Sequence, residues 1–172
     1  MARHSDGTLT KLMGKSDLVT GANSLAALYY QGVIKLYDGA QPADANDAIT
    51  TQTLVGTITL GEGAFTEGVG TNGLVFGTPT VTGTGAAKVV SLPRPAGTLW
   101  GAICPTLSGT KTATWGRLQA NTVDSGGSST TLCRTQVTVS DSTGSGELKL
   151  NTVTCATGTE LIVATFEIKL GA

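Results

Sequence analysis

Apolar and polar residues alternate along most of the chain, and turns rich in glycine, proline, aspartate and asparagine separate the alternating runs. The pattern is clearest at residues 33–60, where an apolar run, a polar turn and a second apolar run follow one another. Alternation with a period of two is typical of strands that have one drier face. The pattern therefore predicts an all-β domain of short strands.

The expected strands cover most of the chain after residue 32, and two features of their arrangement can be predicted. The turn residues between 132–140 and 147–151 predict a hairpin. The last strand, 161–170, is the most amphipathic, with its even-numbered residues 162–170 on the apolar face. The expected strands are 33–37, 54–60, 74–76, 78–82, 87–92, 98–103, 112–120, 132–140, 147–151, 153–155 and 161–170.

The first 31 residues differ from the rest. Residues 1–17 are small and polar without periodicity, which predicts an arm that orders only against a partner. Residues 17–31 carry apolar side chains at helical spacing, and Gly32 can end that helix. We expect two parts: an extended N-terminal arm with one short helix at 1–31, and an antiparallel β-sandwich of jelly-roll type at 32–172.

Composition supports one β domain and narrows the functions. The 172 residues include 24 glycines and 30 threonines, and only 13% are charged. Threonine suits the half-buried surface of a sheet and glycine suits its turns. The net charge of −1 and the pI near 5.7 disfavour nucleic acids and anionic membranes as partners. No apolar run approaches the roughly 20 residues of a membrane span, and residues 1–17 lack a secretory signal, so we expect synthesis in the cytoplasm.

The cysteines do not form a metal-binding pattern. Cys104, Cys133 and Cys155 are widely spaced, and the chain has a single histidine, so a zinc site lacks ligands. Cys133 shares a strand face with Val137 and Val139, which predicts a buried thiol. The alternatives are a Cys133–Cys155 disulfide or an intermolecular one.

Asp44, Asn46 and Asp47 bring three oxygen-bearing side chains into one loop. A calcium loop needs a bidentate acid at a matching distance, and no glutamate lies at the EF-hand spacing. We therefore interpret the segment as a solvated turn, with a cation site as the alternative.

Gly68, Gly70 and Gly73 match the spacing of a dinucleotide-binding loop. Such a loop must open a helix whose N-terminus meets the pyrophosphate. Strand and turn residues follow here instead, so we interpret the match as chance and expect no cofactor.

Trp115 and Arg117 lie two residues apart in an expected strand, with Leu118 and Ala120 on its other face. Such a pair can stack on a sugar or base, and Trp100 offers a second ring for a glycan. The simpler interpretation is a pair at the core edge, in which the guanidinium covers the ring.

Catalytic side chains are scarce. The only histidine, His4, lies in the expected arm, and no pattern brings two carboxylates together. We expect neither catalytic residues nor an enzyme. A hydrolase would have to use acids such as Asp44 and Asp47.

Four segments, residues 34–42, 54–60, 115–117 and 147–170, resemble a family of small virion proteins of tailed bacteriophages and prophages. Shared features are the strand and turn at 34–42, the aromatic-x-Arg strand and the closing strands. The chain departs from the family in its Thr-Trp-Gly-Arg sequence, the glycine-rich insertion after Leu60 and its cysteines. The resemblance implies a β-sandwich present in many copies in the particle, without catalytic residues.

These observations together lead to a hypothesis about function. We expect a capsid decoration or cement protein, a homotrimer that binds the outside of the major capsid protein shell in the virion. Uncharged strand edges suit symmetric association, in which neighbours cover them. A neck, collar or tail component is the first alternative, and a glycan- or receptor-binding module is the second.

Overall fold

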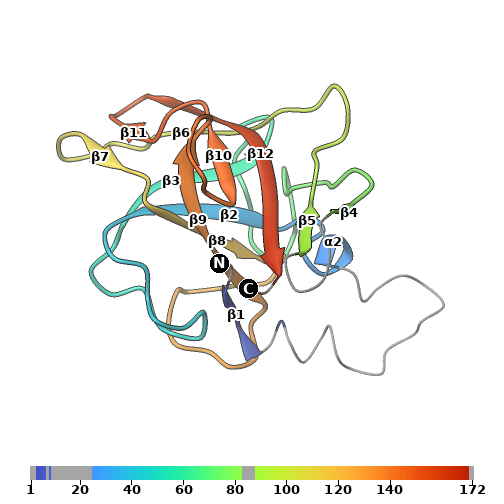
Figure 1. The fold of residues 1–172 in the computed structure, drawn as a ribbon. Coiled ribbons are helices and arrows are strands. Elements are labelled where there is room, and N and C mark those ends of the chain that lie inside the picture. Colours follow the sequence, from blue (N-terminus) through green and yellow to red (C-terminus); the bar gives the residue numbers. More distant parts are fainter. Residues whose placement is uncertain (1–2, 7, 9–24, 83–87, 171–172) are drawn as a thin grey trace.

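Strands dominate the computed structural model, which describes residues 3–6, 8, 25–82 and 88–170 (Figure 1). The elements are β1 (Arg3–His4), α2 (Leu25–Leu28), β2 (Val33–Asp38), β3 (Thr53–Leu60), β4 (Thr80–Thr82), β5 (Lys88–Ser91), β6 (Trp100–Ile103), β7 (Lys111–Thr112), β8 (Trp115–Gln119), β9 (Arg134–Asp141), β10 (Leu148–Leu150), β11 (Thr154–Cys155) and β12 (Glu160–Leu170). The prediction of an all-β fold is confirmed. No helix among the described residues is long and apolar enough to cross a membrane.

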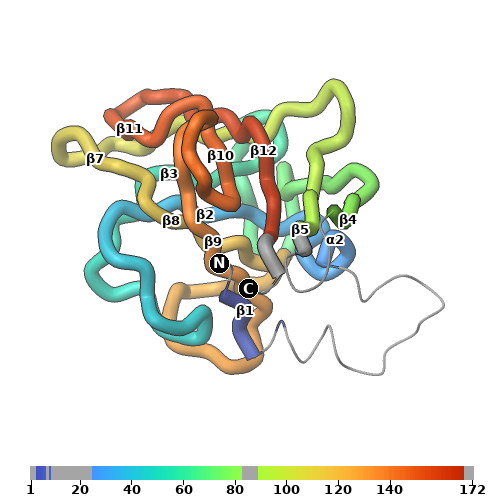
Figure 2. Tube along the Cα trace, viewed as in Figure 1, coloured from blue at the N-terminus to red at the C-terminus, as the bar shows by residue number. Residues whose placement is uncertain are grey.

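Seven strands close into a barrel. Neighbours pair in the order β9, β8, β2, β3, β6 and β12, and β10 pairs with both β12 and β9, which joins the two ends of the row. Figure 2 shows β10 between these two strands. We expected two stacked sheets, whereas the pairing forms one continuous ring because short β10 bonds on both sides.

The strands β9 and β10 run parallel. Residues 148–150 pair in ascending order with residues 139–141, so the chain loops back through a short turn and restarts beside the strand it has just left. A side chain at Gly146 would place its Cβ 2.6 Å from the Ser140 nitrogen, so this turn depends on glycine. The predicted hairpin is therefore wrong: the two strands are adjacent, but their direction is the opposite of that expected.

Apolar side chains from every strand of the ring fill the barrel. Gly56 and Gly116 also face this interior, where an added Cβ would lie 3.3 Å from Leu161 and 3.1 Å from Ile34. Space is short even for a methyl group, so the interior is a packed core. Core residues at most 2% exposed include Ile34, Leu36, Ile58, Ala102, Leu118, Val137, Leu148, Leu161 and Ile168.

The strand β12 changes face along its length. Its buried residues are Leu161 and Val163 in the first half, and Phe166 and Ile168 in the second. The pairing with β10 shifts at a bulge within residues 163–165, and the extra residue turns the strand over. The prediction that even-numbered residues face the core is therefore wrong for the first half of this strand.

Further strands extend the sheet beyond the ring. The strand β5 pairs with β12, and β4 pairs with β5 as the last strand of the row. All three residues of β4 are exposed, and Val81 is 62% exposed. The strands β7 and β11 form a separate two-stranded sheet.

The start of the chain lies on the barrel of its own chain. The strand β1 pairs antiparallel with β9. His4 Nδ1 and the Tyr29 hydroxyl each lie 2.7 Å from Thr135 Oγ1, and the Tyr29 hydroxyl lies 2.7 Å from Thr8 Oγ1. These described residues of the expected arm thus lie against the barrel of their own chain, and the rest of 1–24 lies outside the described residues.

Several element boundaries differ from those predicted. The helix predicted at 17–31 is observed at Leu25–Leu28, and its first eight positions lie outside the described residues. Residues 74–76 form no strand, because Leu74 bonds only to the backbone at Gln31 and Gly32. The strand predicted at 112–120 divides into β7 and β8, because Thr114 turns to bond the carbonyl groups of Tyr37 and Gly39.

Candidate functional site

A groove of about 480 Å³ on the outside of the barrel is a candidate site. Its floor is formed by β2 and β3, and its walls by the loop after β3 and the end of β6. Leu54 and Ile103 contribute exposed apolar surface, at 40% and 50% exposure, and Phe65 and Pro105 also line the groove. An apolar groove with polar groups at its margin is the usual form of a binding surface.

An ion pair lies at one side of the groove. Lys35 Nζ donates to Glu67 Oε1 at 2.8 Å, and the Asp124 N–H donates to Glu67 Oε2 at 3.0 Å. Burial acts to raise the pKa of Glu67, but the hydrogen bonds from Lys35 and the Asp124 N–H, with the charge of Lys35, hold it below its usual range. Glu67 therefore stays charged, and its ion pair with Lys35 fixes the loop after β3 to β2.

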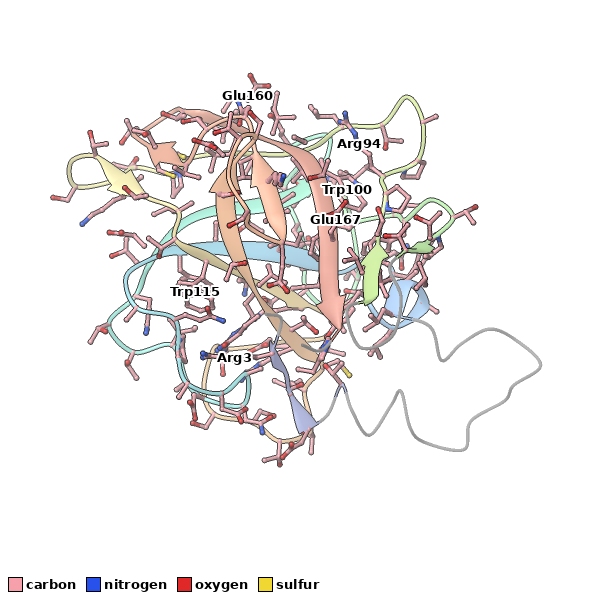
Figure 3. The ribbon with its side chains drawn as sticks, viewed as in Figure 1. Arg3, Arg94, Trp100, Trp115, Glu160 and Glu167 are labelled. Atoms are coloured by element: carbon pink, nitrogen blue, oxygen red, sulfur yellow. The ribbon has the colours of Figure 1, made fainter. Side chains whose placement is uncertain are left out.

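Two carboxyl groups meet near the same groove. Glu62 lies close to Glu160, and burial first, then interaction with the Glu160 carboxyl group and its charge, raise the pKa of Glu62. Gly101 makes room for Glu62, since an added Cβ would lie 2.8 Å from its Oε1. Such a pair retains a proton at pH values at which separate carboxylates are ionised. Figure 3 shows Glu160 at the end of the barrel where β12 begins.

No pattern in the sequence indicates this carboxyl pair. Glu62 follows β3 and Glu160 opens β12, and they meet because β6 pairs with both strands. The acids lie far apart in the sequence, and only the strand order brings them together. No sequence pattern brought two carboxyl groups together, whereas the structure does so for Glu62 and Glu160.

The structure brings Asp44, Asn46 and Asp47 together, but as a hydrogen-bonded turn. Asp47 Oδ2 accepts the Asp44 N–H at 2.9 Å, and Asp44 Oδ1 accepts the Asn46 N–H at 2.7 Å. Asn46 Oδ1 accepts the Asp6 N–H. These oxygen atoms serve the turn, and no cluster of three His, Cys, Asp or Glu side chains suited to a metal occurs within the described residues.

The glycine-rich loop does not form a phosphate-binding turn. Gly68 and Gly70 adopt φ values of 78° and 76°, and Gly73 lies against the backbone of Gln31. The chain continues from Gly73 as an extended segment bonded to residues 31 and 32, without the helix that a dinucleotide site requires. The interpretation of a chance match is consistent with this geometry.

Both tryptophans are 1% exposed. Trp115 stacks on Tyr37 with ring centroids 4.6 Å apart, and the Arg117 guanidinium carbon lies 5.7 Å from the centroid of the Trp115 ring. Trp100 contacts Phe76 edge-on, well away from Trp115 (Figure 3). The predicted core-edge pair of Trp115 and Arg117 is confirmed, and neither tryptophan presents a ring to a sugar.

The three cysteines are buried and none is in a disulfide. Cys104 and Cys155 are neighbours: burial, and next the charge and hydrogen bond of Cys155, raise the pKa of Cys104 to about 12. The predicted burial of Cys133 is confirmed. The suggested Cys133–Cys155 disulfide is wrong in this structure, because the thiol near Cys155 is that of Cys104.

Comparison with protein-family models, with curated proteins and with solved structures finds no match to this chain. The site geometry and the resemblance in sequence pattern are therefore the grounds on which a function can be argued.

Proposed function

We propose that this protein is a structural component of a bacteriophage virion: a capsid decoration or cement protein that binds the outside of the major capsid protein shell as a homotrimer and stabilises it. The resemblance to small virion proteins supports the assignment to a virion. We further propose that the barrel is flattened, so that its strands form two facing walls. In that form it would match the jelly-roll-like sandwich expected from the sequence.

The exposed edge of β4 is the main structural evidence for self-association. This strand, Thr-Val-Thr, is uncharged, all three of its residues are exposed, and within the described residues only β5 pairs with it. An uncharged edge with open backbone N–H and C=O groups is a template for another strand. Monomeric proteins usually protect such an edge with charge or proline, and identical copies can cover it in a closed oligomer.

We assign the groove beside β3 to the capsid subunit. Exposed Leu54 and Ile103 supply apolar contact area, and the Lys35–Glu67 ion pair supplies a polar margin. This combination of an apolar centre and a polar rim is the usual anatomy of a protein interface.

Binding to capsid shells tests the proposal directly. Purified protein should add to undecorated shells at saturable stoichiometry and raise their melting temperature, because a ligand of the assembled state stabilises it. Immuno-gold labelling of intact particles should mark the head. Failure to bind shells, together with label on the neck or tail, would replace this proposal with the alternative of a neck, collar or tail component.

A pair of exposed valines tests the role of the edge. Val81→Lys places a charge on β4, whereas Val123→Lys places the same charge on a loop residue that is 71% exposed. Sedimentation should show that the Val81 variant is monomeric and that the Val123 variant keeps the wild-type oligomer. An unchanged oligomer in both variants would reject association through β4.

A further inference from the structure

Two arginines lie on the outer face of the barrel beneath covering loops. On β8, Trp115, Arg117 and Gln119 point away from the core, and the register places Arg117 opposite Gln136 and Gln119 opposite Arg134. Arg117 and Arg134 are therefore diagonal neighbours on one face. Both are 0% exposed.

Two loops seal this face from solvent. Residues 39–52 and 120–133 bond to each other, with the Ile49 N–H donating to Gly126 O at 2.8 Å and the Ser129 N–H donating to Asn46 O at 2.9 Å. Arg117 Nη2 donates to Asp47 O in the first loop at 3.0 Å. The arginines thus lie in a closed compartment, where an uncompensated charge is costly.

The compartment holds more positive than negative charge. Asp124 is its buried acid, and its carboxylate is fully used: Arg134 binds it through two nitrogens, and Gln119 Nε2 and the Gly126 N–H donate to it at 2.8 Å. Two buried guanidinium groups therefore share one buried carboxylate, and the other acid whose charge acts on Arg117, Asp47, is exposed.

Several N–H groups of the same compartment have no partner among the described residues. They are Arg117 Nε, Arg117 Nη1, Arg134 Nη1 and Trp115 Nε1, each buried. The ring of Trp115 lies beside the Arg117 guanidinium group and offsets part of its charge. The ring does not accept a hydrogen bond from the unpartnered N–H groups. Buried arginine donors are normally satisfied, so the set indicates a missing acceptor.

We propose that Arg117 and Arg134 bind a small monovalent anion of the chloride class between their guanidinium groups. One negative charge balances the buried excess, and an anion accepts hydrogen bonds from nitrogens of both arginines. A water molecule could accept the same bonds but would leave the charge uncompensated. Because both arginines are 0% exposed, we expect a small anion rather than a large one such as gluconate.

A cleft of about 400 Å³ between the two loops is lined by Asn46, Asp47 and the hydroxyl-bearing residues 128–131. It shares Asp47 with the compartment, because the Asp47 carbonyl oxygen accepts a hydrogen bond from Arg117 Nη2.

Thermal unfolding of the full chain tests the proposal, with sodium chloride exchanged for sodium gluconate at constant ionic strength. The melting temperature should rise saturably with chloride and bromide in the wild type. Arg117→Gln should abolish this rise, and the control Arg94→Gln, which changes an exposed arginine, should retain it. A melting temperature that is the same in chloride and gluconate would overturn the proposal.

Anomalous scattering from wild-type crystals grown in sodium bromide gives a second test. It needs no variant, so it does not depend on whether Arg117→Gln folds. A bromide peak between the guanidinium groups of Arg117 and Arg134 is expected. Density without anomalous signal at this place would identify ordered water only and reject the anion.

Discussion

Arg134 on β9 holds Asp124 by two parallel charge-assisted hydrogen bonds, from Nε to Oδ2 at 2.7 Å and from Nη2 to Oδ1 at 2.5 Å. Neither side chain is more than 3% exposed. Burial acts to raise the pKa of Asp124, but the hydrogen bonds from Arg134 and the Gly126 N–H hold it below its usual range. The ion pair therefore fixes the loop 120–133 over the outer face of the barrel.

Removing the charge of Asp124 should destabilise the protein more than removing an exposed charge does. Asp124→Asn leaves Arg134 buried without its counter-ion, and we expect a loss of about 3–5 kcal/mol in the free energy of unfolding. Lys111→Ala is the control, because Lys111 and Asp38 form a partly exposed pair at 3.9 Å that is worth less than about 1 kcal/mol. Urea denaturation measures both. Equal losses in the two variants would contradict the role of the buried pair.

The pairing of β1 with β9 should weaken in mild acid. Burial lowers the pKa of His4 from 6.5, and the charge of Glu147 opposes this only in part. Because the folded state favours the neutral ring, its contribution to stability is present above the ordinary pKa and is lost as the pH falls through the lowered value. Proteolysis within residues 1–8 should therefore speed up between pH 7 and pH 5. His4→Gln, which stays neutral, should show no such change.

The alternation of apolar and polar residues predicted the strands well, because it depends only on residues that are close in the sequence. The segments 33–37, 54–60 and 161–170 coincide closely with β2, β3 and β12. The ring was not predictable, because it depends on three residues of β10 that pair on both sides. The bulge in β12 was not predictable either, since one extra residue reverses the faces without changing the composition.

The same distinction applies to the sites. Trp115 and Arg117 were paired correctly because residues two apart on a strand share a face. Glu62 with Glu160 and Cys104 with Cys155 were missed, because each pair is distant in sequence and meets only through the order of the strands. Burial of the whole face that holds Arg117 depends on two loops with no periodic pattern of their own.

The Glu62–Glu160 contact should make stability depend on pH in the opposite sense to His4. Burial first, and then Glu160, raise the pKa of Glu62 above 4.5, so its contribution is fully present below that value and is lost as the pH rises through the raised pKa. Glu160→Gln removes the repulsion and should raise the melting temperature at pH 7 by about one or two degrees, with little change at pH 4. Glu167→Gln, on the same strand, is the charge-matched control and should give no such pH-dependent gain. A gain equal at both pH values would contradict the shared proton.

Gly73 should tolerate no side chain. An added Cβ would lie 2.1 Å from Gln31 O and 2.4 Å from its carbonyl carbon, at a place where Leu74 and Gln31 are joined by a backbone hydrogen bond of 2.8 Å. Gly73→Ala must therefore separate the two segments, and we expect a loss of about 1–3 kcal/mol or more in urea denaturation. Gly127→Ala is the matched control: its nearest contact would be Ser125 Oγ at 3.6 Å, so its effect should stay within about 0.5 kcal/mol. Equal stability of the two variants would contradict the close approach of the Gly73 and Gln31 backbones.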